Sequence, residues 1–317
     1  MNVSQVSYFT LSAYFDIGPF KYGIFLVIMC VYMFIIGSNV LLIVVICVNR
    51  SLHEPMFLFL CSLFVNELLG SLGLFPFLLV QILSDVHSVS VPLCFLQIFC
   101  LYMYVNVEFY NLAVMSYDRY LAVCHPLHYS TQMQMSKVSR LVLFSWFIPL
   151  LNIIVMISLN ASSGLCGNVI DRVMCVNYYV TKLLCSGATA SNVYGLVYTF
   201  SVLLSLAALI LYTYVRILKV CFSGSKQTRQ KAISTCTPHL ASVLNFSFGS
   251  FFEILQSRFD LSRLPAVLRI VLSLYFVTCQ PFFNPLVYGL KLGKIRMACK
   301  TLFFHRRKPC NKRTSTL

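Results

Sequence analysis

The chain has 317 residues, of which 59% are hydrophobic and only 10% are charged, and its formal net charge is +15. A soluble domain carries about 25% charged residues, so this composition excludes an ordinary soluble protein and favours one whose solvent is lipid. The basic residues lie between apolar runs and form no basic face with interleaved aromatics, which argues against nucleic-acid binding.

The N-terminal segment, residues 1–22, is mixed polar and aromatic. It has no basic region before an apolar core, so we expect no cleavable signal peptide and a first membrane helix that acts as an uncleaved signal. The sequon Asn2-Val3-Ser4 predicts a glycan at Asn2 on a short extracellular N-terminus. A second sequon begins at Asn160, close to a membrane helix.

Seven apolar stretches are long enough to cross a bilayer as helices, which takes about 20 residues each. They cover residues 23–48, 57–83, 94–120, 140–159, 192–216, 234–256 and 267–290. The expected fold class is all-α: a seven-transmembrane helix bundle in one domain, residues 23–290. The third and sixth stretches contain polar residues that only a bundle interior would tolerate.

Lys and Arg residues set the expected orientation. With the N-terminus outside, 18 of the 24 lie on or beside cytoplasmic segments and six lie on the outer side. We therefore expect a multi-pass plasma-membrane protein with an extracellular N-terminus and a cytoplasmic C-terminus. Residues 291–317 would form a cytoplasmic amphipathic helix, over 291–304, and a basic tail. Cys299 or Cys310 could carry a palmitate there, and a plain basic tail is the alternative.

Four of the 14 cysteines lie on the outer side of the expected bundle. Cys94 opens the third span, and Cys166, Cys175 and Cys185 lie in the long loop after the fourth. An even number in an oxidising compartment suggests two disulfide bonds, and sequence spacing leaves all three pairings open. A bond from Cys94 to the loop would fix the loop over the mouth of the bundle.

Two acids, Glu67 and Glu108, fall at mid-depth in the second and third spans. They would repel each other unless a proton or a cation lay between them, so we expect a sodium or proton site that both share. The alternative is that both are protonated and hydrogen-bonded to neighbours such as Asn111 or Asn284.

Asp118 and Arg119 end the third span at the cytosolic surface. They form either an ordinary interfacial pair or a lock on a neighbouring helix that is released on activation. In the seventh span, two prolines four residues apart remove backbone donors and weaken the helix. The result is either a static kink or a hinge at which Asn284 and Tyr288 change partners.

Several motifs now resemble one known family. The segment from Met115 to Tyr129, MSYDRYLAVCHPLHY, is similar to the third-helix signature of olfactory (odorant) receptors, among the rhodopsin-like (class A) G-protein-coupled receptors. Residues 52–57 resemble the family's first inner loop in its fish-type form, residues 231–240 the start of its sixth helix, and residues 281–288 its seventh-helix motif. Gly37-Ser38-Asn39 fits the first helix and Trp146 the fourth. The resemblance covers residues 23–300.

The resemblance implies roles for individual residues. It pairs Cys94 with Cys175 and Cys166 with Cys185, and it places sodium at Glu67 and Glu108, where Glu67 departs from the commoner aspartate. Arg119 should contact the G protein and the inner ends of helices five and six, through Tyr212 or Tyr214. The sixth helix has Phe246-Ser247-Phe248-Gly249 where Phe-Tyr-Gly is usual. The residues implied in coupling and activation are Asp118, Arg119, Tyr120, Tyr214, Phe248, Asn284, Pro285 and Tyr288.

The resemblance also implies a small-molecule pocket between the outer halves of helices three, five, six and seven. Leu101 stands where amine receptors place an aspartate, so a cationic amine would lack its counter-ion and aminergic ligands are disfavoured. The remaining lining should be apolar with a few hydroxyls and amides. The expected ligand-binding residues are Leu101, Tyr102, Val105 and Asn106, counted from Cys94, and Phe251, Phe252, Glu253, Leu274 and Val277. Glu253 would either accept a hydrogen bond from a polar ligand or face outer water.

The implied function is that of an odorant receptor that activates a heterotrimeric G protein of the olfactory stimulatory type, raises cyclic AMP and needs no cofactor beyond the sodium ion. Its partners would be an odorant, the G protein and membrane lipid. One alternative is a non-olfactory chemosensory or small-molecule class A receptor, and a remote one is a transporter, although no symmetry between halves is found. An enzyme is not expected: metal-ligand and phosphate-loop motifs are absent, and His125, His128 and His239 read as interfacial residues.

Overall fold

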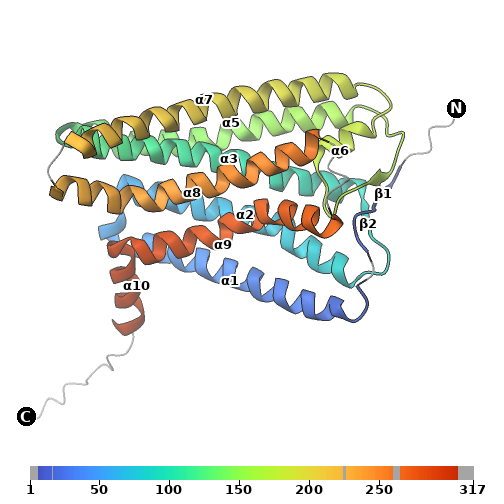
Figure 1. Ribbon diagram of the computed structural model, residues 1–317, viewed down its shortest axis with the longest axis horizontal. Helices are drawn as coiled ribbons and strands as arrows, with labels where there is room; N and C mark the ends of the chain where they lie inside the picture. Colours follow the sequence, from blue (N-terminus) through green and yellow to red (C-terminus); the bar gives the residue numbers. More distant parts are fainter. Residues whose placement is uncertain (1–5, 16, 224–225, 260–264, 306–317) are drawn as a thin grey trace, which may run out of the picture.

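The computed structural model describes residues 6–15, 17–223, 226–259 and 265–305. Within them, seven long helices lie along one another in a single bundle (Figure 1). Each expected span lies inside one of these helices, so the prediction of an all-α bundle is confirmed. The helices are α1 Phe20–Val48, α2 Pro55–Leu83, α3 Val91–Cys124, α5 Met135–Ala161, α7 Ala188–Ser223, α8 Lys226–Arg258 and α9 Ala266–Lys291.

Six of the long helices have the length and apolarity to cross a membrane, namely α1, α2, α3, α5, α7 and α9. In the described part of the chain, α8 is the long helix that falls outside this group. Its polar residues include His239 and Ser242, which are buried inside the bundle rather than exposed on its surface. A membrane helix surrounded by other helices tolerates such residues, and the sequence analysis expected this of the sixth span.

The outside of the bundle is apolar. In α7, none of the residues in the most apolar 18-residue window is buried. Leu204 and Leu211 of that helix are 68% and 66% exposed. A protein in water rarely exposes so large a continuous apolar surface, whereas lipid chains solvate it well.

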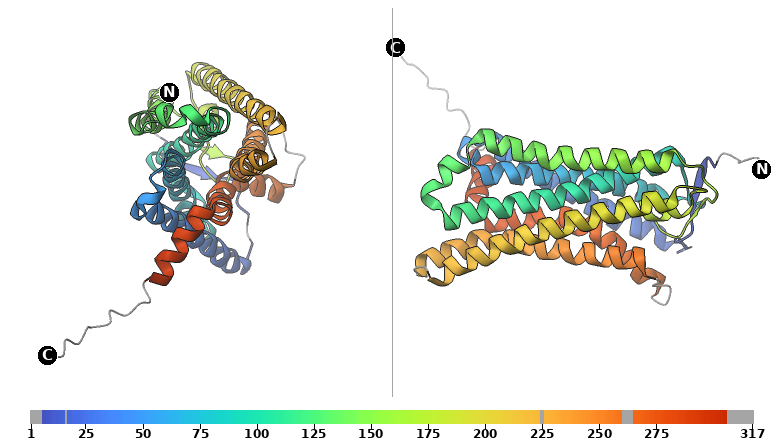
Figure 2. Two further views of the ribbon diagram at one scale, coloured as in Figure 1. Left: turned by 90° about the vertical axis from the view of Figure 1, so that its left-hand side faces the viewer. Right: turned by 90° about the horizontal axis from the view of Figure 1, so that it is seen from above.

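α3 occupies the middle of the bundle, where it packs against α2, α5, α7 and α8 (Figure 2). Two glycines let α2 approach it closely. A Cβ atom at Gly70 would lie 2.5 Å from the ring of Tyr104, and one at Gly73 would lie 2.7 Å from the Cβ atom of Cys100. Small residues at such positions allow membrane helices to pack with their backbones close together.

A three-stranded sheet, which the sequence analysis did not predict, lies at one end of the bundle, called here the sheet end (Figure 1). The central strand is β1 (Tyr8–Leu11), which pairs antiparallel with β2 (Ser88–Ser90) and parallel with β3 (Val169–Ile170). Phe9 and Leu11 are buried and alternate with exposed residues, as expected for a strand with one covered face. The sheet joins the N-terminal segment to the loops that precede α3 and follow α5.

The opposite end, called here the α10 end, holds the helix α10 (Gly293–His305), which turns away from the bundle axis (Figure 1). It takes the place of the amphipathic helix expected over residues 291–304. Ile295 is fully buried and Met297 is 63% exposed, so the helix has one covered and one open face. Four short helices complete the described fold: the α-helices α4 (Tyr129–Gln132) and α6 (Asn177–Lys182), and the 3-10 helices η1 (Arg50–Leu52) and η2 (Pro126–His128).

Candidate functional site

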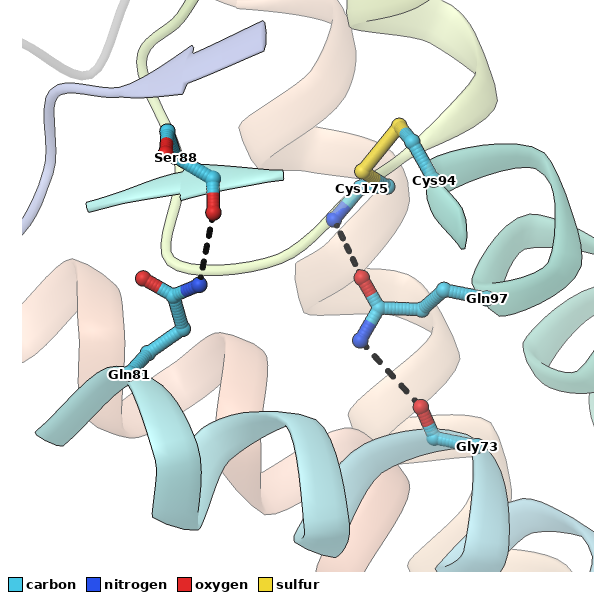
Figure 3. Close-up of a disulfide and its surroundings, with 6 residues drawn as sticks. All are labelled: Gly73, Gln81, Ser88, Cys94, Gln97 and Cys175. Atoms are coloured by element: carbon cyan, nitrogen blue, oxygen red, sulfur yellow. Dashed lines mark hydrogen bonds between the residues drawn. A yellow bond between two sulfur atoms is a disulfide. The ribbon is translucent and has the colours of Figure 1, made fainter. Parts of the chain in front are cut away.

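The long loop between α5 and α7 is fastened to the end of α3. Cys94 and Cys175 form a disulfide bond, and their Cα atoms are 5.5 Å apart (Figure 3). The side chain of Gln97 accepts a hydrogen bond from the backbone N–H of Cys175 at 2.8 Å and donates one to the carbonyl of Gly73 at 3.2 Å. Gln97 thereby joins α2, α3 and the loop, and loop residues are held over the interior of the bundle.

A second disulfide bond closes the long loop on itself. It joins Cys166 to Cys185, whose Cα atoms are 5.0 Å apart. The backbone N–H of Cys185 also donates to the carbonyl of Gly164 at 2.8 Å. The structure therefore contains the two cysteine pairs that the family resemblance implies.

A cavity of about 190 Å³ lies between α3, α7, α8, α9 and the long loop. Of the expected ligand residues, Leu101, Tyr102, Val105, Asn106, Glu253 and Val277 line it. The four from α3 recur at helical spacing, which is why counting from Cys94 found them. The lining residues that the sequence analysis missed are Phe109, Met174, Cys175, Val176, Tyr178, Leu196, Thr199, Phe200, Val202, Leu203, Ser250, Ile254 and Phe276.

Three expected ligand residues are not among those that line the cavity. Phe251 is 58% exposed on the outside of α8. A helix turns by about 100° per residue, so Phe251 and Phe252 cannot share the face that Ser250 and Glu253 present to the cavity. Leu274 packs instead against a cluster of buried apolar side chains. The expectation for these three residues is therefore corrected.

The aromatic residue of α8 that reaches the cavity wall is Phe246 rather than Phe248. Phe246 is 1% exposed, and its ring centroid lies 4.6 Å from that of Phe109 and 5.7 Å from that of Phe276. Both of these partners line the cavity. Phe248 is 52% exposed and contacts Phe252 on the outer face. Phe248 also packs edge-on against Tyr275 of α9, so in this packing it lies beside α9 and not at the cavity wall.

The two mid-depth acids lie together in the interior. Glu67 and Glu108 are both fully buried. The Nδ2 group of Asn284 donates hydrogen bonds to Oε1 of Glu67 and, at 3.3 Å, to Oε1 of Glu108. Asn66 donates to Oε2 of Glu108 at 3.0 Å. Asn284 is thus a partner as expected, whereas Asn111 instead accepts hydrogen bonds from hydroxyl groups of α2 and α5.

The oxygen atoms of this acid pair fit a small hard cation or a shared proton. The buried Oε2 atom of Glu67 has no hydrogen-bond partner among the described residues. Sodium and similar cations prefer carboxylate and carbonyl oxygens as ligands. Groups of three or more His, Cys, Asp or Glu that could hold a metal are absent from the described part of the chain. The donor set is therefore limited to Glu67, Glu108 and neighbouring neutral groups.

The proline-containing part of α9 is supported by α1. Pro285 has no backbone N–H, so the carbonyl of Pro281, four residues earlier, loses its helical donor. The Nδ2 group of Asn39 donates to this carbonyl at 3.0 Å. Further along α9, Tyr288 is 2% exposed, its ring packs edge-on against Phe64, and its hydroxyl has no hydrogen-bond partner among the described residues. A change of partner at Tyr288 would therefore sacrifice no hydrogen bond.

At the α10 end of α3, Arg119 forms an ion pair with Asp118. Asp118 also accepts a hydrogen bond from the hydroxyl of Tyr129 in α4 at 2.7 Å. In this packing, the hydrogen-bond and ion-pair partners of Asp118 come from α3 itself and from α4, the short helix that follows it in the chain. Tyr120, which follows Arg119 in the chain, shares a 2.9 Å hydrogen bond with the ring of His125.

Tyr214 and His239 form a hydrogen-bonded link that the sequence analysis missed. The hydroxyl of Tyr214 in α7 and Nδ1 of His239 in α8 are 2.5 Å apart, and Nε2 of His239 lies 3.0 Å from the carbonyl of Leu112 in α3. His239 is 2% exposed, so the interpretation of this histidine as an interfacial residue is wrong. The available signal was a histidine within an apolar span, where polar groups must find partners.

The modification sites fall in different parts of the chain. Asn160 is 1% exposed, donates to Asn177 at 2.6 Å and accepts from Ser191 at 2.5 Å. A side chain buried in this way cannot carry a glycan. Asn2 and Cys310 lie outside the described residues. Cys299 is half-buried in α10.

Known proteins match this chain in sequence along almost its whole length. A family model described as "Olfactory receptor" matches residues 28–306. Human olfactory receptor 10A6 is 31% identical over 96% of this chain and 97% of its own, and human olfactory receptor 11A1 is 32% identical over 98% and 96%. A crystal structure of squid rhodopsin superimposes with a TM-score of 0.73, at 17% identity over 91% of this chain and 82% of that one, and shows the same fold.

Proposed function

Because the chain belongs to the olfactory receptor family of G-protein-coupled receptors, we propose that its cavity is the odorant site and that the α10 end of α3 is the G-protein site. As a member of this family it binds odorants, couples to a G protein, crosses the plasma membrane several times and is not an enzyme.

The observation that carries the assignment of the odorant site is the cavity itself. It lies in the interior, is lined mostly by apolar and aromatic side chains, and is covered in part by a disulfide-fastened loop. Such a site suits a small organic molecule, since burial of apolar surface supplies the affinity and a few polar groups supply the orientation. A ligand with few heavy atoms would bind with modest affinity.

Activation would be a shift between two packings of the bundle. In the packing described, Ile217 and Cys221 of α7 lie against Ala232 and Cys236 of α8 in one apolar cluster, with Tyr120 of α3 beside them. An odorant that binds an open packing more tightly than this one would move the equilibrium toward it. The α10 end of α8 would then separate from α3, free Arg119 and open a cleft for the G-protein α subunit.

The sheet end would face outside and the α10 end the cytosol. Support comes from the bias of Lys and Arg, of which 18 in 24 lie in or beside the segments that the sequence predicts to be cytoplasmic. In that orientation α10 would lie on the inner leaflet, with its covered face toward the bundle and lipid beside it. The resemblance further supports coupling to the olfactory stimulatory type of G protein, with cyclic AMP as the second messenger.

Glu67 and Glu108, with Asn284, would hold a sodium ion or a shared proton. The support is the convergence of two buried carboxyl groups and one unpaired oxygen. A bound cation would supply the positive charge that two neighbouring carboxylates need.

The first test replaces Arg119. We expect Arg119→Ala to abolish odorant-evoked cyclic AMP while the receptor still reaches the cell surface, because the arginine would contact the G protein rather than the odorant. The measurement is a cyclic AMP reporter in cells, with surface labelling of the same cells. Arg140→Ala, an exposed arginine of α5, is the matched control and should respond like the wild type. A full response from Arg119→Ala would refute the role assigned to Arg119.

A further inference from the structure

Within the described part of the chain, one ionisable acid lines the cavity. Among the described residues that form its wall, Glu253 of α8 is the only Asp, Glu, Lys, Arg or His. An ionised carboxylate only accepts hydrogen bonds, so a ligand group that meets it must be a donor. A carboxylate in apolar surroundings is costly unless an opposite charge or donors compensate it.

Glu253 is half-buried, and its carboxylate has only part of the hydrogen-bond partners that its buried oxygen requires. Its Oε2 atom accepts a hydrogen bond from the hydroxyl of Ser273 in α9 at 3.3 Å. Its Oε1 atom is buried and has no hydrogen-bond partner among the described residues. One oxygen of the acid is thus held by the protein, while the other lacks the donor that would offset its burial.

The nearby base, Arg172 of the long loop, is committed to other groups. Its Nη1 atom donates to Gln256 and to Ser273, both at 2.8 Å, and its Nη2 atom donates to the hydroxyl of Tyr179 at 2.7 Å. The guanidinium also lies over the ring of Tyr179, 4.7 Å from its centroid. Arg172 is not one of the cavity-lining residues. It anchors the loop to α8 and α9 and makes no direct ion pair with Glu253 in the described structure.

The rest of the cavity suits an organic cation. Five aromatic residues line it, and their ring faces attract positive charge as well as apolar surface. The sequence analysis disfavoured amines because Leu101 leaves α3 without a counter-ion. Glu253 supplies an acid from the opposite wall, on α8, so this objection does not apply to the folded cavity. The aromatic lining residues are Tyr102, Phe109, Tyr178, Phe200 and Phe276.

We propose that Glu253 selects protonated amines, so that the preferred odorants of this receptor are small primary or secondary amines with an apolar body. The ammonium group donates to the carboxylate of Glu253, and the apolar body fills the space between α3 and α7. The inference rests on the proposed role of the cavity as the odorant site, and it names the class of odorant.

The test compares amines with alcohols of the same skeleton: benzylamine with benzyl alcohol, and cyclohexylmethylamine with cyclohexylmethanol. Responses are measured by the cyclic AMP reporter, and binding is measured by the thermal shift of the purified full chain in nanodiscs. We expect the wild type to prefer the amine of at least one pair. Glu253→Gln should weaken the binding and the potency of that amine by about tenfold or more, because a buried charge pair is lost. The binding and potency of the matching alcohol should change much less.

Two further variants serve as controls. Asp85→Asn removes a negative charge from a side chain that is 91% exposed at the sheet end, and it should leave both ligands unchanged. Glu253→Asp keeps the charge and should keep the preference for the amine at reduced potency. If Glu253→Gln does not reach the surface, Glu253→Asp and Glu253→Ala binding in nanodiscs decide the point, since only the aspartate should retain the preference.

The outcomes separate this inference from the proposed function. A wild type that binds neutral odorants but none of the amines would overturn the inference and leave the odorant receptor intact. The inference would also be overturned if Glu253→Gln weakened the binding of amine and alcohol equally, or weakened the binding of neither. A receptor that promotes no nucleotide exchange with any compound would instead overturn the proposed function.

Discussion

Glu67 and Glu108 show, at the scale of single residues, how this protein accommodates acids in its interior. Both are fully buried, and amide groups of Asn66 and Asn284 supply donors to their carboxyl groups. The neutral amides satisfy hydrogen-bond acceptors of the carboxyl groups. They carry no net charge, so they do not cancel the repulsion between two ionised carboxylates. If both groups are ionised, the pair needs a positive charge from elsewhere, which the proposed sodium ion or shared proton would supply.

If the ion is sodium, it should stabilise the folded receptor. At ten times its dissociation constant, a ligand of the folded state alone contributes about 1.4 kcal/mol. We expect the unfolding temperature of purified receptor to be higher in sodium chloride than in choline chloride of equal ionic strength, and Glu108→Gln to lose the difference. Glu54→Gln, an exposed acid paired with Lys294, is the control and should keep it. An increment that survives in Glu108→Gln, or none in the wild type, would leave a shared proton as the explanation.

Part of the candidate site could be predicted residue by residue. Leu101 and Val105 were placed correctly because Cys94 fixes the rotational phase of α3, and helical spacing does the rest. No comparable marker fixes the phase of α8, so Phe251 was expected in the cavity and Ser250 was not. Because a helix turns by about 100° per residue, an error of one or two residues in the rotational phase places a side chain on the wrong face. No residue of α7 marks which of its faces lines the cavity, so its lining residues cannot be predicted from the sequence.

At the scale of elements, the contact between α2 and α3 depends on two positions without side chains. Gly70 faces the buried ring of Tyr104, and Gly73 faces Cys100. In lipid, apolar side chains gain little by leaving the solvent, so helix association relies on close packing. The same interface carries Glu67 and Glu108, and its spacing therefore also fixes the distance between the two acids.

Replacing Gly70 should separate these helices. We expect Gly70→Ala to destabilise the receptor by about 1–3 kcal/mol, because its Cβ atom would lie 2.5 Å from the Tyr104 ring and the buried ring would have to move. The unfolding temperature of purified receptor and its surface expression measure the effect. Gly37→Ala in α1, which would meet no atom within 4 Å, is the control and should be neutral. Equal stability of the two variants would show that the α2–α3 interface accommodates the added methyl group at Gly70, contrary to this prediction.

The helices were predictable as elements, whereas the sheet was not. Long apolar runs mark membrane helices whatever their partners are, and each run expected lies within a helix of the structure. The strands have four, three and two residues, and β1 pairs with β2 across about 80 positions of the chain and with β3 across more than 150. Segments so short carry no periodic signal of their own, and their pairing depends on loops that the bundle brings together.

At the scale of the whole molecule, the two described ends of the chain lie at opposite ends of the bundle (Figure 1). The sheet end carries both disulfide bonds, and the α10 end carries the Asp118–Arg119 pair. Disulfide bonds persist in the oxidising space outside the cell, and G proteins bind inside it. These two chemical features therefore agree with the charge bias on one orientation in the membrane.

That orientation can be tested directly. An epitope placed before residue 1 should be labelled by antibody on intact cells, and one placed after residue 317 only after permeabilisation, because the bias of Lys and Arg retains the α10 end in the cytosol. A tag in the exposed turn around Leu127 should behave like the C-terminal tag. Labelling of both termini from the same side would contradict the proposed topology and with it the count of seven crossings.

The central position of β1 in the sheet has a consequence for biosynthesis. Ribosomes make Tyr8–Leu11 before any other described element, yet one of its neighbours, β3, begins only at Val169. During translation β1 can pair with β2 once Ser88–Ser90 has been made, but its other edge has no partner strand until more than half of the chain has been synthesised. Pairing of β1 with β3 therefore comes late in synthesis, and it completes the sheet.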